Sequence, residues 1–170
     1  MNCLGVTLPA LGGIALSACA AQFPVPERLP LAPPEPVVAR TPMERLAASG
    51  REVWDMFRCA HFAGVLGNGR RVALIRAAIA RGRPIVDAII DGDLDETTAR
   101  RFMPLGFVRS ISRAAGTDFS LGTLHARTAE VARLDIRIGL GDDLAQVSKD
   151  DIKANTRKRY RETGCDGFLQ

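Results

Sequence analysis

Proline is spread very unevenly along this chain of 170 residues, and its placement limits where helices can form. Seven of the ten prolines lie between Pro24 and Pro42, whereas only Pro84 and Pro104 lie in residues 43–170. Proline has no amide proton to donate and disrupts the interior of a helix. We therefore expect residues 19–42 to form an extended segment and residues 43–170 to form the folded domain.

Apolar residues in this domain recur three or four positions apart, which is the spacing of a helix that buries one face. Between Val53 and Leu66 only Asp55, Arg58 and His61 are polar, so this stretch is predicted to be the central, mostly buried helix. The pattern predicts an all-α fold, an irregular bundle of five to seven helices. In chain order, the predicted helices cover residues 42–66, 70–81, 84–91, 94–102, 104–115, 118–136 and 149–163.

Several helix boundaries are predicted from capping and breaking residues. Gly82 is expected to end one helix and Pro84 to begin the next, while Asp93 is expected to cap a further helix with Glu96 three positions on. Ser148 is expected to cap the last helix. Residues 136–140 alternate between apolar and polar side chains, so a short strand is an alternative there. The helix over 70–81 is predicted to bury Val72, Ile75 and Ile79.

The composition excludes several classes of protein. A chain that is 46% hydrophobic and 25% charged is an ordinary globular protein, which excludes a disordered chain, a collagen-like repeat and a multi-span membrane protein. The net charge is +4, from 23 Lys+Arg and 19 Asp+Glu. Acidic residues are interspersed among the basic ones except at residues 157–161, so we expect no nucleic-acid partner.

The N-terminal segment predicts where the protein is located. Residues 4–21 carry no charge, and an apolar stretch of this length that ends in small residues is typical of a secretory signal. Its end, Leu16-Ser17-Ala18-Cys19, resembles the lipobox of bacterial lipoproteins. The resemblance implies that residues 1–18 are a signal peptide and that the Cys19 thiol carries a diacylglycerol. It also implies that a fatty acid such as palmitate acylates the new amino terminus after cleavage.

By the same resemblance, Ala20 implies sorting to the outer membrane, with the domain facing the periplasm. Several acyl chains anchor a protein stably, because each buried CH₂ contributes roughly 0.8 kcal/mol. Three alternatives remain for the same segment. Residues 18–20 also fit the site of the ordinary signal peptidase, which would release a soluble periplasmic or secreted protein that begins at Ala21. The segment would otherwise be an uncleaved anchor or the start of a cytoplasmic chain.

Residues 19–42 are predicted to be a lipidated, proline-rich tether between the membrane and the domain. Proline-rich segments adopt an extended conformation of about 3.1 Å per residue, so about twenty residues of the segment 22–42 would span roughly 60 Å. The alternative is a strap that lies along the surface of the domain.

Cys59 and Cys165 are the two cysteines of the domain. In the oxidising periplasm that the lipobox implies, such a pair is expected to form a disulfide. The bond would fasten the end of the last, weakly apolar helix to the central helix, and it would stabilise the fold by at most roughly 4–5 kcal/mol. The alternative is two unpaired thiols.

The domain has two histidines, His61 and His125, and both lie on apolar stripes. Because a lone histidine in such a place is usually a core residue, neither is predicted to be catalytic. No cysteine or histidine pair has the spacing of zinc ligands, and residues 91–96 match only the start of an EF-hand loop. We therefore expect no metal and no other cofactor. The sequence also lacks a nucleophile elbow, a phosphate-binding loop and a dinucleotide-binding motif.

These features predict a membrane-tethered envelope lipoprotein that acts as a non-enzymatic binding or accessory module for another envelope protein. The alternative is a hydrolase of the cell envelope with a site assembled around His61 or His125. A cleft that brings a carboxylate to one of these histidines would favour the hydrolase. A shallow, exposed apolar surface would favour the binding module.

Overall fold

The computed structural model describes residues 41–138, 140 and 147–169, and all the regular structure in these residues is helical. The prediction of an all-α bundle with five to seven helices is confirmed. The predicted signal peptide, Cys19 and residues 19–40 of the tether lie outside the described residues. The elements are α1 (Pro42–Leu66), α2 (Arg71–Asp91), α3 (Glu96–Phe102), α4 (Leu105–Val108), α5 (Gly116–Ile138), α6 (Lys149–Glu162) and the short 3₁₀ helix η2 (Cys165–Leu169).

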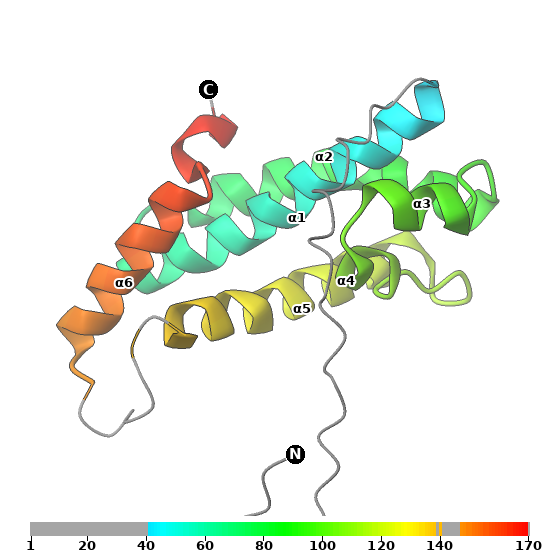
Figure 1. The fold of residues 1–170 in the computed structure, drawn as a ribbon. Helices are drawn as coiled ribbons and strands as arrows, with labels where there is room; N and C mark the ends of the chain where they lie inside the picture. Colours follow the sequence, from blue (N-terminus) through cyan, green and yellow to red (C-terminus); the bar gives the residue numbers. More distant parts are fainter. Residues whose placement is uncertain (1–40, 139, 141–146, 170) are drawn as a thin grey trace, which may run out of the picture. The chain divides into compact units, whose positions relative to one another are not determined.

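Helix α1 is the central helix, as predicted, and it contacts α2, α3, α5, α6 and η2 (Figure 1). Thr41 caps its start: the Thr41 hydroxyl accepts the Glu44 amide at 3.1 Å, and the Glu44 carboxylate accepts the Thr41 amide at 2.8 Å. Gly67 ends the helix at a φ of 67°, a conformation that favours glycine. Within the described helices, no segment is long and apolar enough to cross a bilayer.

Helix α2 runs unbroken through Gly82 and Pro84, so the predicted break at these residues is wrong. Gly82 lies where α2 packs against α1 and α5. A Cβ at this position would be 3.0 Å from Val53 and 3.1 Å from Leu121, so the glycine permits close packing and does not end the helix. Pro84 and Ala80 are both exposed. Water can therefore solvate the Ala80 carbonyl, which has lost its amide donor.

The buried face of α2 also differs from the prediction. Val72 is 55% exposed and Ile79 is 36% exposed, while Ile75 is half-buried. The prediction failed because it placed the end of a helix at Gly82. In the unbroken helix, apolar residues before and after the glycine lie on the same buried face. The apolar residues that α2 buries are Leu74, Ala78, Ile85, Val86, Ala88 and Ile89.

The segment around α3 and α4 corrects two further boundaries. Asp95, rather than Asp93, caps α3, since its carboxylate accepts the Thr98 amide at 2.9 Å and the Thr98 hydroxyl at 2.7 Å. Helix α4 ends at Val108 instead of continuing to residue 115. The backbone beyond it turns towards α5, where the Ser112 amide donates to the Ser120 hydroxyl at 3.0 Å.

Helix α5 begins at Gly116 and extends to Ile138, so a strand over residues 136–138 is wrong. The Ile136 carbonyl accepts a hydrogen bond from the Asn155 side chain of α6. The C-terminal end of α5 is therefore helical where it contacts α6. The apolar alternation over residues 136–140, on which the strand alternative depended, does not correspond to alternate burial, because Ile136 is buried whereas Ile138 is 74% exposed.

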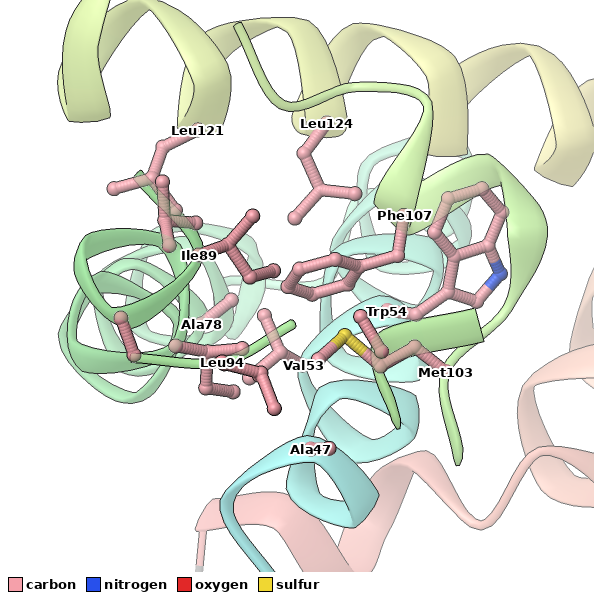
Figure 2. Packing of buried hydrophobic residues seen from close by; sticks show 14 of the residues in the cluster. Ala47, Val53, Trp54, Ala78, Ile89, Leu94, Met103, Phe107, Leu121 and Leu124 are labelled. Carbon is pink, nitrogen blue, oxygen red and sulfur yellow. The ribbon is translucent and has the colours of Figure 1, made fainter. Parts of the chain in front are cut away.

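Most of the buried apolar side chains form one core between α1, α2, α5 and the α3–α4 segment (Figure 2). In Figure 2, the ring of Phe107 points from α4 towards Leu124 and Ile89. Trp54 packs against Gly106, where a Cβ would lie 2.9 Å from Trp54 Cζ3 and still closer to Cη2. The glycine therefore provides the space that the indole occupies.

Helix α6 begins as predicted. The Ser148 hydroxyl accepts the Asp151 amide at 3.1 Å, and the Asp151 carboxylate accepts the Ser148 amide at 3.2 Å. Beyond the helix, η2 begins at Cys165. A second, smaller group of buried side chains joins this region to α1 and α5, and it includes Cys59, Phe62, Ile136, Tyr160 and Cys165.

Candidate functional site

The predicted cysteine pair comes together in the structure. Cys59 of α1 and Cys165 of η2 are both fully buried, their Cα atoms lie 5.5 Å apart, and their sulfur atoms are at disulfide distance. Cα atoms joined by a disulfide are usually 4.4–6.8 Å apart, as a rough range. This geometry favours the disulfide over two unpaired thiols, and it ties the end of the chain to the central helix.

His61 of α1 and His125 of α5 also come together. Their rings stack with centroids 5.0 Å apart and an angle of 20° between the planes, and Phe57 lies 5.4 Å from the His125 ring. Both histidines are half-buried at the contact between α1 and α5. Each histidine lies on an apolar stripe of its own helix, but nothing in either stripe of the sequence indicates that the two rings meet.

The surroundings of this histidine pair favour uncharged rings. Burial lowers the pKa of His61, and the nearby positive charges of His125, Arg71 and Arg133 lower it further, while a hydrogen bond to the His125 backbone opposes them. Burial and the charge of Arg71 lower the pKa of His125. Arg71 packs over α1, with its Cδ 3.2 Å from where a Cβ on Gly64 would lie.

The Nε2 nitrogen of each histidine is closed to a substrate. Nε2 of His61 and Nε2 of His125 are both buried without a hydrogen-bond partner, so a substrate has no access to them. Within the described residues, neither ring is hydrogen-bonded or ion-paired to a carboxylate that would orient it. A histidine that takes a proton from a nucleophile normally has both an accessible nitrogen and such a partner.

An apolar groove lies beside this pair, at the end of the bundle where α1, α5 and α6 meet. Its volume is about 330 Å³. Arg133 and Arg137 line it, and neither forms an ion pair with a described residue. Sequence patterns did not indicate this groove, because its lining comes from three separate parts of the chain. Its apolar residues are Val65, Ile136, Leu140, Val147 and Ile152.

A second recess is polar, and the protein's own charges fill it. Arg58 binds Asp55 at 2.8 Å and also binds Asp135. Burial alone would lower the Arg58 pKa, but these two carboxylates outweigh burial and raise it. Arg159 donates to the Asp135 backbone carbonyl at 3.2 Å and pairs with Glu162 at 3.1 Å. Because the cations already have counterions, we interpret this recess as an ion network that joins α1, α5 and α6.

In the part of the chain that the structure describes, no three histidine, cysteine or acidic side chains form a group that could hold a metal ion. Cys59 is paired with Cys165, and His61 faces His125. Asp95, in the acidic stretch that resembles the start of an EF-hand loop, caps α3.

Comparison of the chain with protein families, with curated proteins and with solved structures finds no match. The structure itself defines the class: an all-α domain with a buried cysteine pair at disulfide distance and an apolar groove at one end of the bundle.

Proposed function

We propose that this protein is a lipid-anchored protein of the cell envelope that acts as a non-enzymatic binding or accessory module. The Cys59–Cys165 pair is the observation that carries the proposal. Disulfides persist in oxidising compartments such as the periplasm and are rare in the cytosol. The cysteine pair therefore agrees with the uncharged N-terminal segment and the lipobox ending at Cys19. In this proposal the lipid on Cys19 is inserted in the outer membrane, and the domain faces the periplasm.

The apolar groove supports a binding role. Its lining is mostly apolar, and Arg133 and Arg137, which also line it, have no counterion among the described residues. A partner that fits it is an envelope protein that presents apolar side chains flanked by carboxylates, because arginine pairs well with carboxylates. Nucleic acid is not a partner in this proposal, since it is absent from the proposed compartment.

Membrane fractionation of the native host tests the anchor. Wild-type protein is expected to remain in the membrane fraction after a high-salt wash, because acyl chains do not depend on charge for their attachment. The variant Cys19→Ser is expected to be released or to accumulate unprocessed. Wild-type protein found in the soluble periplasmic fraction would overturn the proposal.

Two exposed valines provide a matched test of the groove. Val65 lines the groove and is 40% exposed, whereas Val72 lies outside it and is more exposed. Cross-linking in the native envelope is expected to yield a specific adduct with wild-type protein and with Val72→Glu, and none with Val65→Glu. An adduct that is equally strong for both variants would exclude the groove as the binding surface.

A further inference from the structure

Four exposed cationic side chains form an oblique row on α6, which turns by about 40° around the helix axis at each step of four residues. They recur every four residues and all four are exposed, and we call Lys149, Lys153, Arg157 and Arg161 the basic row. With a rise of 1.5 Å per residue, the row extends for roughly 18 Å along the helix. Helix α6 lies at the outer edge of the bundle in Figure 1, so the row is accessible to a large surface.

The other side of α6 is held against the bundle. Thr156 is buried, the Asn155 side chain donates to the Ile136 carbonyl, and Arg159 Nε donates to the Asp135 carbonyl at 3.2 Å. The cysteine pair fastens the chain just beyond the helix. These contacts fix the rotation of α6 about its axis. Arg157 and Arg161 therefore face away from the bundle, whereas Lys149 and Lys153 are exposed on the side of the helix that carries the buried Tyr160.

The basic row has no counterions within residues 41–138, 140 and 147–169. None of its four members forms an ion pair or a side-chain hydrogen bond there, whereas the neighbouring Lys158 and Arg159 both pair with Glu162. Like charges four residues apart on a helix repel each other. An anionic surface outside the domain would offset this repulsion.

We propose that the basic row docks on the anionic phospholipid headgroups of the membrane that holds the chain, an inference that rests on the proposed lipid anchor. An anionic membrane surface favours each nearby Lys or Arg by a factor of roughly five. The row has no apolar member, so the contact is electrostatic, stays at the level of the headgroups and weakens as salt is added.

The chain itself provides a selective probe of this contact, because its three lysines, Lys149, Lys153 and Lys158, all lie on α6. Protein purified from its native host is bound to vesicles of phosphatidylcholine, alone or mixed with phosphatidylglycerol, and lysine acetylation is followed by peptide mass spectrometry. We expect Lys149 and Lys153 to react roughly fivefold more slowly on the anionic vesicles, with the protection lost at high salt. Equal rates on the two vesicles would overturn the proposal.

Two matched variants distinguish an effect of the basic row from an effect of the net charge of the domain. Arg157→Glu with Arg161→Glu is expected to remove the protection of Lys149 and Lys153. Arg109→Glu with Arg113→Glu makes the same change of charge at exposed positions on another part of the domain, and it is expected to leave the protection intact. Equal loss of protection in both variants would overturn the proposal. Far-UV circular dichroism confirms that each variant is folded.

Intact-mass measurement on the same preparation separates this inference from the proposed anchor. Protein that is acylated at Cys19 but shows no lysine protection would overturn docking by the basic row and leave the anchor in place. Protein that is protected on anionic vesicles but carries no acyl chain would support the row and overturn the anchor.

Discussion

The imidazole rings of His61 and His125 stack across the contact between α1 and α5, with their centroids 5.0 Å apart. Burial lowers the pKa of both rings, and the charges of Arg71 and Arg133 lower that of His61 further. The folded domain therefore favours two neutral rings. Protonation would place a positive charge beside another histidine and two arginines.

We predict that thermal stability falls as the pH is lowered from about 7 to about 5. In the unfolded chain both histidines regain an ordinary pKa near 6.5, so the unfolded state binds more protons over this range. The stabilisation is present above the unfolded pKa and is lost as the pH falls through the lower, folded pKa. The Asp95 and Asp151 pKa values are lowered from 3.8, so these carboxylates titrate below this range.

Circular dichroism melts across this pH range measure the effect. The variant His61→Gln with His125→Gln removes both titrating groups, so its melting temperature is expected to vary less with pH than that of the wild type. The same pH dependence in both proteins would show that the histidine pair is not responsible.

The Cys59–Cys165 pair is predicted to stabilise the domain by about 2–4 kcal/mol, because the bond restricts the unfolded chain. The two residues are 106 positions apart. Urea unfolding of the oxidised wild type is compared with that of Cys59→Ala with Cys165→Ala. Reduction of the wild type is expected to bring its midpoint to that of the variant. A midpoint that neither reduction nor substitution changes would contradict a stabilising bond.

Gly106→Ala is predicted to destabilise the domain by about 1–3 kcal/mol, because the new methyl group would overlap with the Trp54 ring and force it to move. Gly122→Ala is the matched control: Gly122 is exposed on α5, and a Cβ there would meet no atom within 4 Å. Since alanine favours a helix over glycine, this control is expected to gain roughly 0.5–1 kcal/mol. If chemical unfolding shows the same change in stability for both variants, the packing of Trp54 does not require a glycine at position 106.

The ion network at Arg58 is predicted to contribute more to the free energy of unfolding than an exposed ion pair does. Asp135→Ala leaves a half-buried Arg58 with one carboxylate fewer, at an expected cost of about 1–3 kcal/mol. Asp118 pairs with Arg83 at 2.6 Å, but its side chain is 84% exposed, so Asp118→Ala is expected to cost less than about 1 kcal/mol. Urea midpoints of the two variants compare them directly, and a larger loss for Asp118→Ala would contradict this account.

Local signals predicted those parts of the fold that local contacts determine. The ends of α1 follow from Pro42 and Gly67, and the start of α6 follows from the reciprocal hydrogen bonds of Ser148 and Asp151. The cysteine pairing was also predictable, because only two cysteines lie in residues 43–170. The helix ends depend only on residues that are close in the sequence, and the disulfide involves only two possible cysteines.

Features that depend on distant contacts were not predictable from the sequence. Gly82 and Pro84 resemble helix breakers, but the fit of Gly82 against Val53 and Leu121 shows that the glycine serves helix packing. Likewise, an apolar stripe in the sequence indicates that a histidine is buried, but it does not indicate which residue the histidine contacts. The stacking of His61 on His125 and the groove beside them result from the relative placement of α1, α5 and α6.

Intact-mass and peptide mass spectrometry of the protein from its native host, without reduction, tests the central claim most directly. The account predicts a mature chain that begins at Cys19, carries acyl chains on that residue and contains a Cys59–Cys165 disulfide. A soluble chain that begins at Ala21, carries no lipid and has both domain cysteines reduced would contradict it.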